Sequence, residues 1–154
     1  MTESRSHEFS RADAQRIAAQ HDEIRTLIAR LEDRFAHRFT GDRGLADAGT
    51  LLRNLERRMT EHFELEEKLG FLDRAVEAAP RLARRAVALR QQHGTLEAHL
   101  HLLLEAAPEA RDSDDQWRKS AEAFRLFVAE LARHEEVENE LEIEAHMDDL
   151  GGGD

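Results

Sequence analysis

The sequence predicts an all-α fold, an antiparallel up-and-down four-helix bundle. Ala, Leu, Glu and Arg, which are strong helix formers, dominate its composition, and β-branched residues are few. Only two prolines and eight glycines interrupt the 154 residues. Apolar residues also recur with the 3.6-residue period of an amphipathic helix in four long stretches. Together these observations favour four helices of roughly 25–35 residues joined by short loops.

The first two stretches have recognisable ends. Ser10 is suited to cap the first helix, because a carboxylate follows three residues later. The apolar pattern continues to Phe35, and we expect the segment 41–44 to end it. The second pattern covers 51–69 and stops at Gly70. Residues 71–79 then form a short connection with room for a helical turn.

Proline and polar residues delimit the third and fourth stretches. Pro80 suits the first position of a helix whose apolar pattern covers 82–104. Pro108 and the segment 111–113 break that pattern, and the fourth covers 117–141. The predicted organisation is therefore a flexible N-terminus, a single helical bundle and a disordered glycine-rich tail, with the ranges 1–9, 10–148 and 149–154.

Charge and composition exclude several classes of protein. The net charge of −11 repels nucleic acids and anionic membrane surfaces, so neither is an expected partner. No apolar run approaches the about 20 residues that a membrane-spanning helix needs. The absence of cysteine excludes disulfides and metal–thiolate sites. With no apolar segment typical of a secretion signal near Met1, a cytoplasmic location is expected.

The most informative feature is a duplicated histidine pattern. One histidine falls on the apolar stripe of each predicted helix, and the two histidines of each half are 41 residues apart. Glutamate follows the second histidine of each half by four residues, and glutamine precedes the first histidine of each half. The six side chains of this pattern are His21, His62, Glu66, His93, His134 and Glu138.

Four imidazoles and two carboxylates at one level of a bundle form a plausible metal site. Residues i and i+4 lie on the same face of a helix, so each His-x-x-x-Glu pair can hold one cation or bridge to a second. This donor set suits two iron or manganese ions. A closed zinc site takes four ligands, so six converging groups favour a dinuclear centre.

Alternative interpretations apply to the individual residues. A single core histidine is more often a hydrogen-bonded packing residue than a metal ligand. The His-x-x-x-Glu spacing also occurs at His93 and His101, so one instance carries little weight. Glu97 is a candidate additional ligand, and His99 is expected to line a pocket. The ferritin-like di-iron pattern, Glu-x-x-His, is absent from the sequence.

Over about residues 15–145 the chain resembles the bacterial type of the hemerythrin-like (HHE cation-binding) domain family. The resemblance rests on the segments 21–24, 62–67, 92–96 and 134–138. It implies four terminal histidine ligands, His21, His62, His93 and His134, and two bridging carboxylates, Glu66 and Glu138. It also implies two iron ions joined by an oxo or hydroxo bridge, with manganese as the alternative metal.

The same resemblance implies small-molecule partners: O2, hydrogen peroxide or nitric oxide. The oxygen-carrying members have a second histidine at the position of Glu97 and a longer spacing on the fourth helix, so this chain departs from them. Three functions remain open. These are binding of O2 or nitric oxide, catalase-like degradation of peroxide, and sensing of iron or oxygen through a partner protein.

Overall fold

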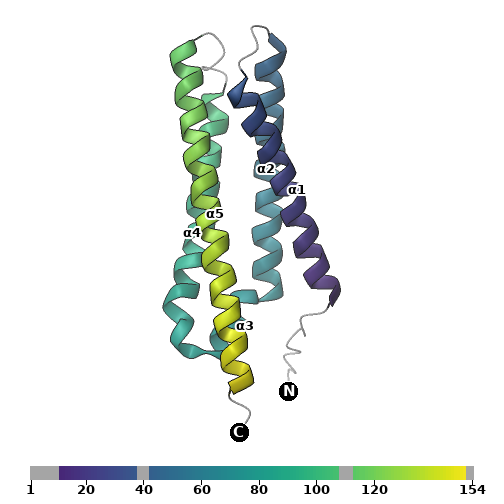
Figure 1. Cartoon of the computed structure of the whole chain (residues 1–154), viewed down its shortest axis with the longest axis vertical. Helices are drawn as coiled ribbons and strands as arrows, with labels where there is room; N and C mark the ends of the chain where they lie inside the picture. The colour runs from purple at the N-terminus through teal and green to yellow at the C-terminus, as the bar shows by residue number, and fades with distance from the viewer. Residues whose placement is uncertain (1–10, 38–41, 108–112, 152–154) are drawn as a thin grey trace.

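The chain is all-helical in every part that the structure, a computed structural model, describes: residues 11–37, 42–107 and 113–151. Four long helices carry the fold, namely α1 (Arg11–Ala36), α2 (Asp42–Leu69), α4 (Ala83–Ala106) and α5 (Asp114–Gly151). A short helix, α3 (Phe71–Ala78), and a 3-10 turn, η1 (Pro80–Leu82), connect α2 to α4. Figure 1 shows the long helices side by side, with α3 at one end of the bundle.

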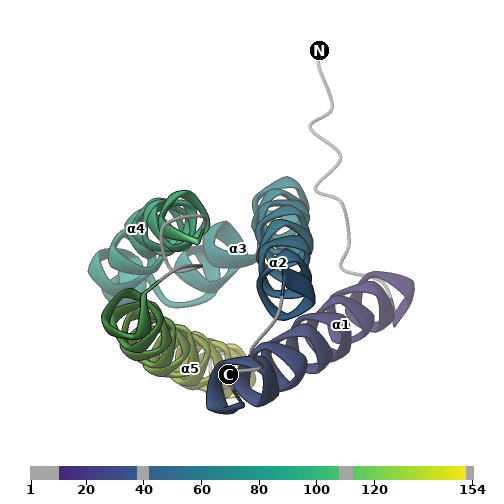
Figure 2. The ribbon, with the colours of Figure 1, turned by 90° about the horizontal axis from the view of Figure 1, so that it is seen from above.

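The long helices surround a common interior. Helix α1 contacts α2, α2 contacts α4, α4 contacts α5, and α5 contacts α1. Figure 2, which looks along the bundle, shows these four contacts as a ring. Helix α3 packs against α4 and α5 and so closes one end of the interior. Among the described helices, none combines the length and the apolar character needed to cross a membrane.

The apolar core is divided into two clusters along the bundle. Leu96 and Leu131 belong to one cluster, and Leu89 and Leu141 belong to the other. On both α4 and α5 a histidine of the duplicated pattern lies between the two clusters. The core is therefore apolar above and below a single layer that contains polar side chains.

The connection between α2 and α4 is more helical than the sequence predicted. Residues 71–78 form the complete helix α3, because the apolar side chains Leu72 and Ala75 are buried against neighbouring helices. Gly70 adopts φ 65°, a left-handed conformation that favours glycine, and it ends α2 as expected. Pro80 occupies the first position of the 3-10 turn rather than that of α4 itself.

Two predicted boundaries were wrong. Helix α2 begins at Asp42, within the segment 41–44 that was expected to be a break. One glycine in a first turn costs only about 1 kcal/mol, which the helix formers that follow offset. Helix α5 continues to Gly151, although the segment from 149 was expected to be disordered. The predicted flexible N-terminus, the cap at Ser10 and residues 152–154 lie outside the described residues.

Candidate metal centre

The structure brings all six residues of the duplicated pattern together in the polar layer of the core. Each long helix contributes one histidine, and α2 and α5 each add the glutamate four residues later. Five of the six side chains are buried, and His21 is partly exposed. They form two clusters, each with two histidines and one glutamate: His21, His62 and Glu66; and His93, His134 and Glu138. Within each cluster, the donor atoms lie within 4.8 Å of one another.

In the first cluster, three donor atoms converge. The Nε2 atoms of His21 and His62 lie 3.0 Å apart. Nε2 of His62 also lies 2.9 Å from Oε1 of Glu66. Ligand atoms that share a transition-metal ion lie about 2.0–2.2 Å from it and hence about 3 Å from each other. The spacing of these atoms therefore fits a shared cation.

The second cluster contains buried nitrogen atoms that hydrogen bonds do not satisfy. Nε2 of His134 lies 3.1 Å from Oε2 of Glu138. Within the described residues, that atom and both ring nitrogens of His93 have no hydrogen-bond partner. Unsatisfied polar atoms in a core are costly. A bound cation would satisfy the nitrogen atoms that face the carboxylates, so this cluster also fits a metal.

Glu66 connects the two clusters. Its Oε1 faces His62 in the first cluster, and its Oε2 lies 3.5 Å from Nε2 of His93 in the second. The carboxyl groups of Glu66 and Glu138 are also close enough for each to influence the pKa of the other. The two carboxyl groups therefore meet where the clusters adjoin, which is the position that bridging ligands between two ions occupy.

Burial disfavours the ionised form of both carboxyl groups. It raises the pKa of Glu66 to about 7, and it also raises the pKa of Glu138. Glu142, one turn further along α5, is exposed, yet partial desolvation and then the charge of Glu138 raise its pKa to about 7. Near neutral pH the protein without metal thus holds protons that a cation would displace.

Three of the four imidazoles, those of His21, His62 and His93, are disposed to be neutral, the form that binds metals. Burial, and then the neighbouring His134, lower the pKa of His93 to about 4. Burial also lowers the pKa values of His21 and His62. A neutral imidazole offers a nitrogen lone pair to a cation, so the centre does not need to lose protons from these rings when it binds metal.

Two glutamines orient one histidine in each half. Nδ1–H of His62 donates to Oε1 of Gln20 at 2.9 Å, and Nδ1–H of His134 donates to Oε1 of Gln92 at 2.8 Å. Because an amide oxygen only accepts, each ring carries its proton on Nδ1 and presents a free Nε2 to the carboxylate of its cluster. Such outer contacts are the usual way in which proteins fix a metal-binding histidine.

The other candidates lie outside the two clusters. Glu97, the proposed additional ligand, is in neither cluster, although burial raises its pKa. Oε1 of Glu67, rather than Glu97, approaches Nδ1 of His93, at 3.8 Å. His101 pairs with Glu105 on the surface, at 3.1 Å. His99 lines a groove, as the sequence predicted.

Sequence reasoning identified the six clustered residues but missed their surroundings. The glutamines were visible as a repeated neighbour of the first histidine, yet their contacts to the second histidine were not predicted. Phe63 was also missed: its ring stacks on His93 with centroids 4.0 Å apart and an angle of 7° between the planes. Only its position next to His62 could have signalled that it faces the core.

Comparison with known proteins gave no relative of this chain. No family model matches it, no curated protein matches it, and no solved structure matches it.

Proposed function

We propose that the protein holds a dinuclear metal centre, with two iron ions bound by His21, His62, Glu66, His93, His134 and Glu138 in a hemerythrin-like antiparallel bundle. The observation that carries this proposal is the position of Glu66, whose two oxygens face different clusters. A pair of independent single-metal sites would not require one carboxylate to lie between them.

Each residue has a distinct role in this proposal. The four histidines are terminal ligands, and Glu66 and Glu138 bridge the ions. Gln20 and Gln92 hold His62 and His134 in the metal-binding tautomer through the contacts described above. Iron is favoured over manganese because nitrogen donors outnumber carboxylates in the set. When bound, a pair of iron ions supplies the capacity to bind or reduce O2, hydrogen peroxide or nitric oxide.

The protein around the centre favours small partners. Phe63 is 3% exposed and lies against His93, so this side of the layer has no space for a large organic substrate. Apolar clusters on both sides of the layer exclude bulk water. We therefore propose a protein that binds or reacts with small oxidants, in which the buried carboxyl groups exchange protons as metal enters and leaves.

Metal analysis and an optical spectrum of the aerobically purified protein test this proposal. We expect two irons per chain in the native protein and in His101→Ala, and loss of iron in His62→Ala. His101 is a matched control because it also precedes a glutamate by four residues but lies on the surface. One zinc per chain, with no second site after anaerobic loading with iron, would contradict the proposal.

The same preparation distinguishes the possible reactions. A stable adduct on exposure to O2 indicates a binding protein, whereas sustained evolution of O2 from hydrogen peroxide indicates catalase-like activity. His62→Ala should lose either activity together with its metal.

A further inference from the structure

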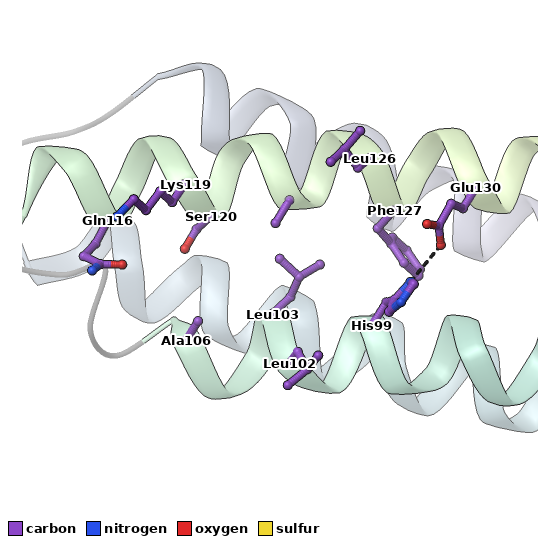
Figure 3. Close-up of a pocket in the computed structure, with 11 residues that line it drawn as sticks. His99, Leu102, Leu103, Ala106, Gln116, Lys119, Ser120, Leu126, Phe127 and Glu130 are labelled. Atoms are coloured by element: carbon purple, nitrogen blue, oxygen red, sulfur yellow. Dashed lines mark hydrogen bonds and ion pairs between the residues drawn. The ribbon is translucent and has the colours of Figure 1, made fainter.

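A groove between α4 and α5 lies outside the candidate metal centre. It has a volume of about 380 Å³, at the lower end of the range for small-molecule sites. Figure 3 shows its apolar walls, with Leu102 and Leu103 on α4 facing Leu126 and Phe127 on α5. Ala106 and Ala123 leave open space between them because their side chains are small.

Two large apolar side chains at the rim of the groove are exposed to solvent. Leu102 is 61% exposed and Leu126 is 56% exposed, although 36% of the residues are charged. Both leucines line the same groove. A molecule with an apolar body would remove this surface from water, which is the main favourable term in binding.

One end of the groove offers a hydrogen-bonding group. Ser120 is only 8% exposed and lines the groove, and Figure 3 shows its hydroxyl directed into the space between the helices. Across the described residues, the structure records no hydrogen bond to this hydroxyl. The hydroxyl is therefore available to hydrogen-bond with an oxygen atom of a molecule bound in the groove.

The charges around the groove disfavour a charged ligand. Lys119 is paired with Asp115 at 3.1 Å, and at the opposite end His99 is paired with Glu130 at 2.8 Å. Both basic side chains at the groove are thus already paired with carboxylates, and the chain as a whole carries a charge of −11. An anion would be repelled, and the apolar walls offer nothing to a cation.

We propose that this groove binds a small uncharged amphipathic molecule with one hydroxyl or carbonyl oxygen. Its apolar body lies between Leu103 and Leu126, and its oxygen meets the Ser120 hydroxyl. A second copy of the chain is a poorer occupant, because two chains of charge −11 repel each other.

The groove lies next to a second cavity that reaches one histidine of the candidate metal centre. Glu130 also lines a second cavity of about 240 Å³, which reaches His134 and its partner Gln92. The groove and the cavity beside this histidine therefore adjoin at Glu130. The proposal does not depend on metal, since no residue of the two metal-binding clusters lines the first groove.

Calorimetric titration of the full chain, as purified, with 1-octanol tests the proposal. We expect 1-octanol to bind the native protein and to lose its binding in Ala123→Phe and Ala106→Phe, which fill the groove from opposite walls. Ala129→Phe and Ala98→Phe are the matched controls, because these alanines are exposed on the same helices and line neither cavity. They should bind 1-octanol as the native protein does.

A second substitution tests the role of the hydroxyl. Ser120→Ala should weaken the binding of 1-octanol about fivefold, as expected for one lost hydrogen bond, and leave the binding of toluene unchanged. Absence of 1-octanol binding, or equal binding to the groove-filling variants and the native protein, would overturn the proposal. So would a native dimer that Ala123→Phe dissociates in sedimentation experiments, because the groove would then be an interface between copies. Metal content, measured in parallel, distinguishes these failures from failure of the proposed metal centre.

Discussion

In the first half of the chain, the residue that follows the second histidine is Phe63; in the second half, it is Glu135. Each acts on the first histidine of the opposite half. The Phe63 ring stacks on His93, whereas the charge of Glu135 acts on His21, where it partly counters the burial that lowers the pKa. One histidine thus has an apolar neighbour, and its counterpart has an acidic one.

The features that the two halves share are the contacts of the second histidine with a glutamine and a glutamate. Both halves use a glutamine to orient the second histidine, at 2.9 Å and 2.8 Å, and both place a glutamate one turn further on. The features that differ are the surroundings of the first histidine. His21 is partly exposed beside Glu135, and His93 is 3% exposed beside Phe63. The two halves therefore have the same kinds of donor side chain, whereas the surroundings of His21 and His93 differ.

The largest expected difference between the halves is in stability. Phe63→Ala should lower the free energy of unfolding by about 3–5 kcal/mol, because it leaves a cavity beside His93. Glu135→Ala, at the equivalent position, should change it by no more than about 0.5 kcal/mol. Chemical denaturation of the metal-free variants measures both values. Equal losses of unfolding free energy in the two variants would show that Phe63 is no more a part of the packed core than Glu135 is.

Glu66→Gln should abolish metal binding and yet stabilise the metal-free protein at pH 8. The pKa of Glu66 is raised from 4.5 to about 7, so its ionised form destabilises the fold increasingly as pH rises through this interval. The gain should reach about 3 kcal/mol above pH 7 and disappear below pH 4.5, where the carboxyl group is protonated in both states. Denaturation across this pH range measures it.

The neighbouring Glu67→Gln is the control for that experiment, because Glu67 is exposed. It should give no gain in stability at either pH. A loss of stability at pH 8 in Glu66→Gln would mean that Glu66 is a satisfied part of the metal-free core.

A smaller effect tests the feature that the halves share. Gln20→Leu and Gln92→Leu should each weaken metal binding about 10- to 100-fold, because the histidine loses the contact that fixes its tautomer. Gln91→Leu, at an exposed position beside Gln92, should have no effect. Competition titrations with a chelator measure the affinities. An effect in only one half would show that the symmetry of the glutamine contacts has no functional meaning.

The sequence was sufficient to predict the parts of the molecule that depend on spacing within one helix. Four residues separate His62 from Glu66 and His134 from Glu138, and that spacing places each pair on one face wherever the helix packs. The helix pattern likewise predicted the four long helices. Contacts between helices depend on their relative rotation and shift, which no local spacing encodes, so the stacking of Phe63 on His93 remained hidden.

Helix α3 was missed for a related reason. Its eight residues are too few to show several periods of an apolar pattern, and isolated helices of this length are marginal. Burial of Leu72 and Ala75 against the long helices stabilises it, and that burial exists only in the folded bundle. The groove between α4 and α5 also arises from two helices together, although His99 indicated part of it.

Mössbauer spectroscopy of the protein loaded with iron-57 tests most directly whether the two clusters are one centre. Because the two oxygens of Glu66 face different clusters, we predict two irons per chain in a single spin-coupled species, with neither site filled alone. Two magnetically independent irons, or a single iron per chain at saturation, would contradict the account.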